Sequence, residues 1–264
     1  MEYTLNCNGQ LIDLRTPQVM GILNVTPDSF FANSRKQTEA EIAMRAQQIL
    51  QEGGTIIDVG ACSTRPNSKP ASEAEETERL RIALSAIRSE MPEAIVSVDT
   101  FRPDVARMAV EEYGAAIIND VGEPSHTGQM FRMVSRLRVP YIYMSRRSNI
   151  KDIMLDCAEA VDTLRLMGQK DIVLDPGFGF GKTLDENHQV LQQLERMKAL
   201  RLPILVGVSR KSMIWKRLQC SPDEALNGTT VLNAIALTKG ASILRVHDVR
   251  EAVETIKLLA DYVF

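Results

Sequence analysis

Eight short apolar runs, rich in β-branched residues, recur along this chain, and nearly every one ends in a polar or charged residue. Periodic helical sequence lies between most of them. Near-continuous apolar strands that alternate with helices are typical of a parallel sheet covered by helices. Eight such units close most simply into a (β/α)8 barrel, which carries its active site at the carboxyl ends of the strands. The eight runs are Val19–Asn24, Thr55–Gly60, Ala94–Asp99, Ala115–Asn119, Val139–Met144, Asp171–Asp175, Pro203–Val208 and Ala241–Arg245.

A separate hairpin signal precedes the first of these runs. Asn8-Gly9 separates Tyr3–Cys7 from Gln10–Leu14, and an Asn-Gly pair between two strands indicates a type I′ turn. Because eight strands follow, we expect residues 1–16 to form a hairpin that closes the bottom of the barrel. The length of 264 residues matches one such barrel. We therefore expect an α/β fold, a TIM barrel, in a single domain over residues 1–264.

Charge and cysteine usage exclude several classes of protein. The net charge is −3 with acidic and basic residues well mixed, so nothing predicts a nucleic-acid partner. No apolar run approaches the length of a membrane-spanning helix, and the amino-terminal residues lack a signal-peptide pattern. The four cysteines show no Cys-x-x-Cys spacing, which favours free thiols over a zinc site or disulfides. We expect a cytoplasmic protein with no membrane partner.

In a closed barrel the polar residues at the strand ends converge on one mouth, and this convergence predicts an enzyme. Three strand-end segments, residues 25–37, 61–71 and 210–221, are long for this fold, and we expect them to act as lids or binding loops. The converging residues are Asn24, Asp99, Asn119, Asp175, Lys211 and His247.

Asp175 ends the sixth run and precedes a glycine-rich segment, Pro176–Lys182. A carboxylate at the floor of a barrel suits a ligand with two adjacent N–H donors, such as the 2-amino and N3 edge of guanine or of a pterin. The same residue can equally well cap the turn ahead of Pro176. The glycines allow the backbone to approach a ligand closely, and Phe180 can offer an aromatic face.

Cationic residues follow the last two runs. Lys211 can donate to a carbonyl oxygen and balance the charge of Asp175, unless it is a solvated surface lysine. Arg245 and His247 flank Val246, so both point to the same side of their strand. A guanidinium beside an imidazole forms an anion site, above all for phosphate oxygens. The alternatives are that Arg245 pairs with Asp248 and that His247 packs in the core.

The first two strand-end loops add further polar groups. Asn24 offers an amide oxygen, a reasonable ligand for Mg²⁺, which usually keeps several waters and binds phosphate oxygens. Thr64 and Arg65 offer donors to an anion, although each could be a turn residue only. Together these residues predict one wall for a donor-rich heterocycle and another for a phosphate-bearing group.

Seven motifs resemble those of the dihydropteroate synthase family, and they occur in the family's order from about Gln18 to the carboxyl terminus. The resemblance implies a TIM barrel that joins 6-hydroxymethyl-7,8-dihydropterin pyrophosphate to para-aminobenzoate and releases pyrophosphate. It also implies Mg²⁺, small-molecule substrates, a homodimer and a target for sulfonamides. The motifs are Met20–Phe30, Ile57–Gly60 with Ser63–Pro66, Ser97–Thr100, Ile118–Val121, Leu174–Lys182, Gly207–Ser212 and Arg245–Val249.

The resemblance also implies a role for individual positions, and four of them are implied to be catalytic: Asp99, Lys211, Arg245 and His247. The implied pterin-binding residues are Asp99, Asn119, Met144, Asp175, Gly207 and Lys211. Those implied for pyrophosphate are Asn24, which also holds the metal, Thr64, Arg65, Arg245 and His247. Those implied for para-aminobenzoate are Phe30, Thr64, Pro66, Phe180, Lys211 and Ser212.

Three places depart from the family pattern: the first loop at Phe31–Ser34, Cys62 in the second loop, and Ser145 after Met144. Two rival functions are retained. A methyltransferase acting on methyltetrahydrofolate shares the barrel and the Asp/Asn floor but has no use for a pyrophosphate site. A paralogue that binds pterins without turnover is suggested by the altered first loop and by Ser145 after Met144.

Overall fold

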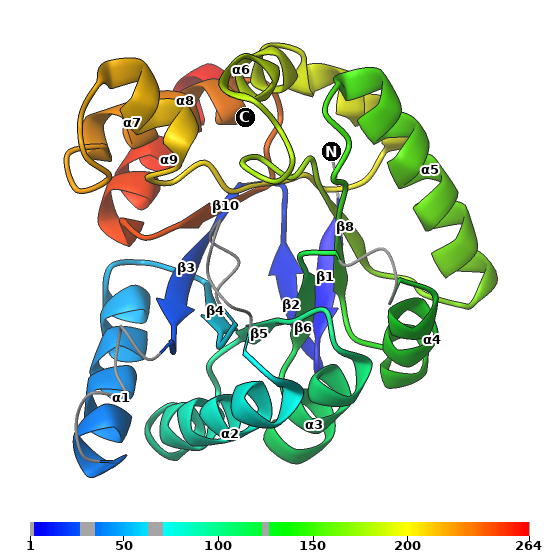
Figure 1. Cartoon of the computed structure of the whole chain (residues 1–264), viewed down its shortest axis with the longest axis vertical. Coiled ribbons are helices and arrows are strands. Elements are labelled where there is room, and N and C mark those ends of the chain that lie inside the picture. The colour runs from blue at the N-terminus through cyan, green and yellow to red at the C-terminus, as the bar shows by residue number, and fades with distance from the viewer. Residues whose placement is uncertain (1–2, 27–34, 63–70, 123–126, 264) are drawn as a thin grey trace.

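The computed structural model describes residues 3–26, 35–62, 71–122 and 127–263. Its main sheet holds eight parallel strands in the order β8-β7-β6-β5-β4-β3-β10-β9. A parallel bridge between Leu174 and Ile204 joins the two outer strands, so the sheet closes into a barrel (Figure 1). The strands are β3 (Gln18–Asn24), β4 (Ile56–Gly60), β5 (Val96–Asp99), β6 (Ile117–Asp120), β7 (Tyr141–Met144), β8 (Ile172–Asp175), β9 (Leu205–Val206) and β10 (Ile243–Val246).

Each of the eight predicted runs overlaps one of these strands, which confirms the (β/α)8 fold. The largest difference is at β9, which covers only two residues of the run Pro203–Val208. Proline at position 203 has no N–H to donate to a neighbouring strand. At the other end, the carbonyl of Val208 accepts from the N–H of Lys211 and so turns away from the sheet.

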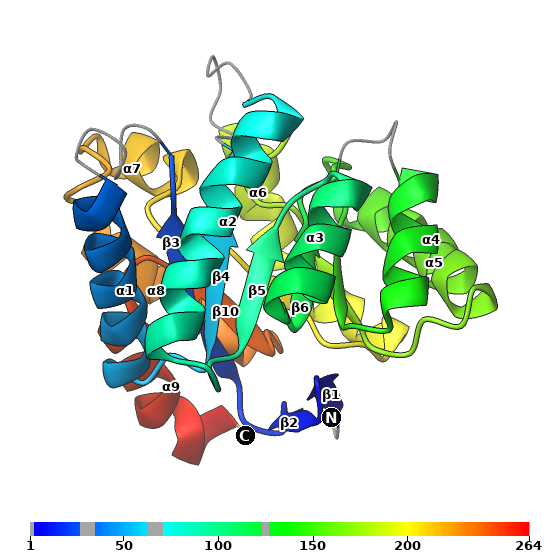
Figure 2. The same ribbon diagram turned by 90° about the horizontal axis from the view of Figure 1, so that it is seen from below.

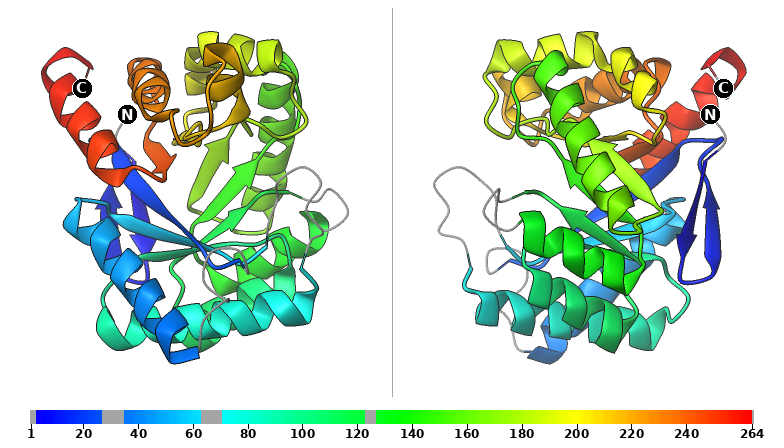
Figure 3. Two further views of the ribbon diagram at one scale, coloured as in Figure 1. Left: turned by 60° about the vertical axis from the view of Figure 1, so that its left-hand side comes forward. Right: turned by 90° about the vertical axis from the view of Figure 1, so that its right-hand side faces the viewer.

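Helices cover the outside of the barrel, as Figures 1 and 3 show. One of them begins with a capping box in which Ser72 and Glu75 satisfy each other's backbone N–H groups. The helices are α1 (Arg35–Gln51), α2 (Glu73–Glu90), α3 (Pro103–Tyr113), α4 (Thr127–Leu137), α5 (Ile150–Leu166), α6 (Leu184–Gln192), the 3-10 helix η1 (Leu194–Leu200), α7 (Ser212–Leu218), α8 (Leu226–Thr238) and α9 (Val249–Val263). Within the described ranges, none of these helices combines the length and apolarity that crossing a bilayer requires.

Successive side chains on each strand alternate between the helices and the barrel interior. On β10, Leu244 and Val246 pack in the outer core under the helices, whereas Ile243 packs in the interior cluster. Arg245 lies between the two outward-facing residues and so points inward. The interior is therefore apolar near the amino ends of the strands and polar near their carboxyl ends.

A hairpin fills the amino-terminal end of the barrel, as predicted. Its strands β1 (Thr4–Cys7) and β2 (Gln10–Asp13) pair antiparallel around Asn8 and Gly9, whose φ angles of 54° and 91° are those that a type I′ turn requires. Figure 2 shows the hairpin below the starts of the barrel strands. Its inner side chains pack with residues at the lower ends of the strands, in a cluster of Leu5, Cys7, Ile12, Leu14, Met20, Ile56, Ala116, Ile117, Ile142, Val173, Leu205 and Ile243.

The strand-end segments differ from the prediction in one place. Residues 210–221 are not an extended loop, because they contain the helix α7, which begins directly after Lys211. Most of segments 25–37 and 61–71 lies outside the described residues.

Candidate active site

Arg245 occupies the centre of the mouth and binds two carboxylates. Its Nε donates to Asp58 Oδ2 at 2.6 Å, and its Nη2 donates to Asp99 Oδ2 at 2.7 Å. Burial by itself lowers the pKa of a guanidinium, but the two carboxylates outweigh it and raise the pKa of Arg245 above its ordinary value. The arginine is thus permanently charged, and most of that charge is balanced from within the barrel.

Asp58 is the residue in this cluster that sequence reasoning missed. It is completely buried, and besides Arg245 its Oδ2 accepts from Asn119 Nδ2 at 3.1 Å. A signal was present in the sequence, because an acid interrupts the apolar run Ile56–Gly60 at a position of the same parity as the interior residue Ile56. Such an acid needs partners inside the barrel.

Asp99 is 15% exposed and binds a second nitrogen of the Arg245 guanidinium. Burial raises the pKa of its carboxyl to about 7, with Arg245 acting in the opposite direction and the negative charges of Asp58, Glu76 and Asp120 adding to the rise. The group therefore changes its charge close to neutral pH, which is unusual for an aspartate.

Asp175 does cap the turn that follows its strand, as the second interpretation of the sequence predicts. The N–H of Gly177 donates to Asp175 Oδ1 at 2.7 Å. Within the described residues this bond occupies one of the two carboxylate oxygens, so capping and ligand binding are compatible. Burial raises the pKa of Asp175, and the nearby Lys211 ammonium opposes that shift.

Two lysines hold the glycine-rich segment after β8. Lys211 Nζ donates to the Phe178 carbonyl at 2.5 Å and lies 4.9 Å from the centroid of the Phe180 ring. Lys182 Nζ donates to the carbonyls of Gly177 at 2.8 Å and Phe180 at 3.3 Å. Burial lowers the pKa of each lysine to about 8, with Asp175 acting in the opposite direction in both cases. Lys211 is therefore no freely solvated lysine, and Lys182 was not predicted as part of this site.

His247 is held by Ser209 and is neutral at physiological pH. Ser209 Oγ accepts from the backbone N–H of His247 at 3.1 Å and lies 3.1 Å from the ring Nδ1. Burial, with the charge of Arg245, lowers the pKa of the imidazole to about 4. A Ser209 hydroxyl that donates to Nδ1 leaves the ring proton on Nε2. The imidazole therefore offers hydrogen bonds and no positive charge.

The proposed pairing of Arg245 with Asp248 does not occur. Asp248 instead accepts two bonds from the guanidinium of Arg210, at 2.9 and 2.8 Å. Arg245 is drawn into the barrel because its parity on β10 directs it there, where two acids face it.

The remaining candidate residues divide into two groups. Asn24 ends β3, Met144 ends β7, Gly207 follows β9 and Ser212 begins α7, so these four lie at the carboxyl ends of strands. A Cβ on Gly207 would stand 3.7 Å from Arg245 Cβ and 3.8 Å from Lys211 Nζ, which places this glycine against both cations. The residues Phe30, Thr64, Arg65 and Pro66 lie outside the described residues.

Asn24 offers an amide oxygen that suits a metal ion. Asn24 Oδ1 and Asp99 Oδ2 lie 3.5 and 3.6 Å from the position that a Cβ on Gly60 would take, so both face the same part of the mouth. The described residues contain no group of three His, Cys, Asp or Glu side chains able to hold a metal. A single amide oxygen fits a Mg²⁺ ion that takes its other ligands from phosphate and water.

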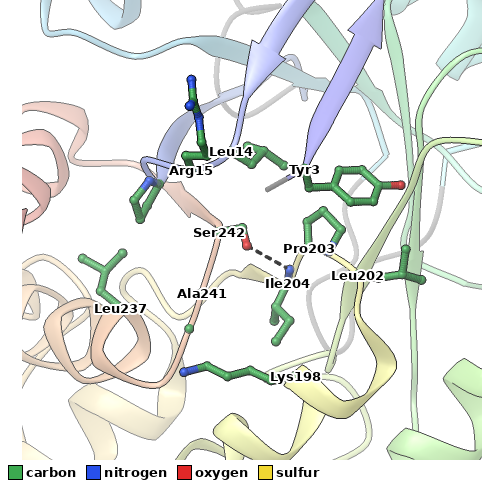
Figure 4. Close-up of a pocket in the computed structure, with 12 residues that line it drawn as sticks. Tyr3, Leu14, Arg15, Lys198, Leu202, Pro203, Ile204, Leu237, Ala241 and Ser242 are labelled. Atoms are coloured by element: carbon green, nitrogen blue, oxygen red, sulfur yellow. Dashed lines mark hydrogen bonds between the residues drawn. The ribbon is translucent and has the colours of Figure 1, made fainter. Parts of the chain in front are cut away.

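A cavity of about 350 Å³ lies at the opposite end of the molecule and is separate from this site. Figure 4 shows it between the hairpin residues Tyr3 and Leu14, Lys198 of η1, and Ser242, which directly precedes β10. Its Ser242 hydroxyl accepts from the N–H of Ile204 at 3.5 Å. None of the candidate site residues lines it.

Comparison with known proteins agrees with this geometry. A family model described as pterin binding enzyme matches residues 20–247. The dihydropteroate synthase of Escherichia coli (strain K12) is 37% identical, over 97% of this chain and 95% of its own. The structure of Xanthomonas albilineans dihydropteroate synthase with 4-aminobenzoic acid matches with a TM-score of 0.90 and 31% identity, covering 99% of this chain and 98% of that one. The structure of the Xanthomonas albilineans enzyme in complex with 7,8-dihydropteroate matches with a TM-score of 0.86 and 31% identity, covering 98% of each chain. Similarity at this level over nearly the whole of both chains shows that the protein belongs to the dihydropteroate synthase family of pterin-binding enzymes.

Proposed function

We propose that this protein condenses 6-hydroxymethyl-7,8-dihydropterin pyrophosphate with para-aminobenzoate to give 7,8-dihydropteroate and pyrophosphate. The observation that carries the proposal is one mouth in which Asp175 and Lys211 lie together with the charged cluster of Arg245, Asp58 and Asp99. Relatives of the same family are dihydropteroate synthases, and the product 7,8-dihydropteroate is bound in one of the matching structures.

The pterin is assigned to the floor of the mouth. Asp175 accepts from the 2-amino and N3 groups of the ring, and Lys211 donates to the ring carbonyl. Asn119 completes the polar edge, while Met144 and Gly207 provide the apolar and backbone surfaces on either side. Because Asp175 and Lys211 lie close enough to shift each other's pKa, the bound heterocycle replaces part of an existing charge pair.

Pyrophosphate is assigned to the rim, near Arg245, His247 and Asn24, with Thr64 and Arg65 from the second loop. Asn24 would hold Mg²⁺ through its amide oxygen, and the ion would neutralise negative charge on the pyrophosphate. Arg245 offers its remaining guanidinium N–H groups at the same place, and neutral His247 supplies a ring N–H.

Breaking the C–O bond at the pterin methylene requires stabilisation of the charges that develop. It does not require a nucleophilic side chain. The C–O bond breaks with its electron pair going to pyrophosphate, and the ring takes up the positive charge. The carboxylate of Asp99 stabilises that charge. The arylamine nitrogen attacks the methylene carbon, forms the new C–N bond and loses its proton to solvent. The amine is neutral near pH 7, so no dedicated base is needed.

Para-aminobenzoate is assigned to the outer part of the mouth. Phe180 offers a ring face beside Lys211, and Ser212 offers the hydroxyl and backbone N–H at the first position of α7. The remaining walls are assigned to Phe30, Thr64 and Pro66. An aromatic acid fits this combination of a ring and a cation.

We also propose that the protein is a cytoplasmic homodimer. Val231 and Ile235 are one helical turn apart on α8 and are 49% and 36% exposed. They suit a contact with a second copy through this helix. Light scattering of the wild type and of Val231→Glu tests the dimer, because a charge in that contact should give monomers.

The decisive experiment measures pyrophosphate release and dihydropteroate formation with and without para-aminobenzoate. Release and product formation that both require para-aminobenzoate support the synthase. Methyl transfer from methyltetrahydrofolate without pyrophosphate release would favour the methyltransferase. Tight pterin binding with neither product would favour the non-catalytic paralogue.

A further inference from the structure

One buried acid beneath the mouth is not used by the proposed reaction. Asp58 is completely buried, so it does not touch a ligand that enters from the mouth. Nevertheless it contacts two of the residues assigned to ligands. Any role of Asp58 in ligand binding must therefore act through those two residues.

Asp58 links three strands through one oxygen. Its Oδ2 accepts from Arg245 Nε at 2.6 Å and from Asn119 Nδ2 at 3.1 Å. The strand β4 that carries Asp58 lies between β6, which carries Asn119, and β10, which carries Arg245, with one further strand on either side. These two hydrogen bonds therefore cross the barrel interior, because β4 pairs directly with neither β6 nor β10.

The contact with Asn119 determines which way its amide faces. A carboxylate only accepts hydrogen bonds, so the amide must turn its NH₂ group toward Asp58. One amide N–H is consumed in this way, and the carbonyl oxygen with the second N–H is left for other partners. Asn119 is thus set to accept an N–H of a bound heterocycle.

The contact with Arg245 fixes its guanidinium plane. Nε is bound by Asp58 and Nη2 by Asp99, so the group is held at two of its three nitrogens. A guanidinium held at two points loses little further freedom when it binds an anion.

Burial of the Asp58 carboxylate lowers the stability of the folded protein. Its second oxygen, Oδ1, is buried and has no hydrogen-bond partner among the described residues. A buried acceptor without a partner costs stability. Retention of such a group is explained more readily by what it orients than by what it contributes to folding.

We propose that Asp58 is the positioning residue of this site, which orients Asn119 to accept a ligand N–H and holds Arg245 for the leaving anion. The inference deepens the proposed function and rests on it for the identity of the ligands. In chemical terms, Asp58 selects a heterocycle that presents an N–H toward Asn119, and it preorganises the guanidinium that meets the phosphate.

The test substitutes Asp58→Asn and measures two separate quantities. Calorimetric affinity for a pterin that lacks pyrophosphate should fall roughly tenfold, because an uncharged amide oxygen replaces the Oδ2 that accepts from both Asn119 and Arg245 and so holds each of them less firmly. The kcat/KM for the pterin pyrophosphate should fall by about a hundredfold or more, since the charge that holds Arg245 is also lost. Values within twofold of the wild type for both quantities would overturn the proposal.

A pH profile separates positioning from a general loss of structure. Asp99 is faced by Arg245 from β10, Asp58 from β4, Glu76 from α2 and Asp120 from β6. Removing the charge of Asp58 should lower the pKa of Asp99, so the acid limb of the kcat profile should move to lower pH. A limb that stays in place, with activity scaled down uniformly, would indicate a structural role only.

Asp120→Asn is the matched control. Asp120 is also a buried acid at a strand end, but its oxygens accept from Tyr141 at 2.6 Å and from the N–H of Gly122 at 2.8 Å. The pterin affinity of the Asp120→Asn variant should stay near the wild-type value even if this variant is less stable. If Asp58→Asn does not fold, Asp58→Ser provides the same measurements with a smaller side chain. Calorimetry requires no turnover, so a protein that makes no dihydropteroate would contradict the proposed function while leaving the role of Asp58 measurable.

Discussion

Ser209 and His247 are joined by two contacts of 3.1 Å each, one from the backbone N–H of His247 to the serine hydroxyl and one between that hydroxyl and the ring Nδ1. Backbone and side chain of the histidine are therefore positioned by a single hydroxyl. The ring is held neutral, because burial and the neighbouring Arg245 oppose its protonation.

The neutral histidine makes the free energy of unfolding depend on pH. The pKa of His247 is lowered from 6.5 to about 4, so the unfolded chain binds this proton more readily than the folded one. The contribution is fully present above pH 6.5 and is lost as the pH falls toward 4, by at most about 3 kcal/mol. Urea unfolding from pH 7 to 4.5 should show a smaller decline for His247→Gln than for the wild type. Parallel curves would contradict the prediction.

Lys211 should determine the alkaline limb of activity. Burial lowers its pKa to about 8, so its charge is lost as the pH rises through that value. Lys211→Arg keeps the charge above pH 8 and should move the alkaline limb of kcat/KM upward, although a guanidinium fits the Phe178 carbonyl less well and overall activity should fall. Steady-state kinetics between pH 6 and 10 test this. A limb that persists unchanged in the variant would assign it to another group, with Lys182 the first candidate because its pKa is also lowered to about 8.

Lys182→Met should weaken para-aminobenzoate binding more than pterin binding. The ammonium holds the carbonyls of Gly177 and Phe180, and methionine keeps most of the apolar stem without either hydrogen bond. We expect the KM for para-aminobenzoate to rise by roughly tenfold, because the loss of these hydrogen bonds leaves Phe180 less firmly placed. The calorimetric affinity for a pterin should change little. Lys198→Met is the control, because that exposed lysine lies at the opposite end of the barrel. Equal losses for both ligands would contradict a local effect on Phe180.

Gly177→Ala should destabilise the protein far more than Gly181→Ala. Both glycines have a positive φ, of 70° and 63°, so alanine is strained by about 1 kcal/mol at either position. At position 177 the added Cβ would also stand 2.2 Å from the Ser145 carbonyl oxygen, whereas at position 181 its nearest neighbour is 3.6 Å away. Urea unfolding should show a difference of roughly 2 kcal/mol or more between the two variants, because the backbone at Ser145 must move. Equal losses would show that the loop relaxes freely.

The strands and the hairpin could be predicted because their signals are local. Apolar runs that end in polar residues mark the barrel strands, and Asn8-Gly9 alone specifies two positive φ angles. The segment after Arg210 was predicted as a loop because Ser212–Leu218 is a helix of only two turns, too short for a periodic apolar pattern to stand out.

The partners within the mouth could not be predicted in the same way. Parity on β10 correctly directs Arg245 inward, but it does not indicate which acid faces it. That depends on the stagger of β4 and β5 against β10, which places Asp58 and Asp99 within reach and leaves Asp248 to Arg210. The neutral state of His247 likewise depends on burial and on a charge brought close only by folding.

The hairpin at the bottom of the barrel has a kinetic consequence. Side chains of β1 and β2 pack among the lower interior residues, so that end of the described barrel is filled with apolar groups. A heterocycle at Asp175 must then arrive and depart through the opening above it. An aminobenzoate beside Phe180 would block that route while it remains bound. Because both substrates use one opening, an ordered binding mechanism is favoured. The pterin, which binds deeper, enters first, and once the aminobenzoate covers it, the pterin reacts more readily than it dissociates.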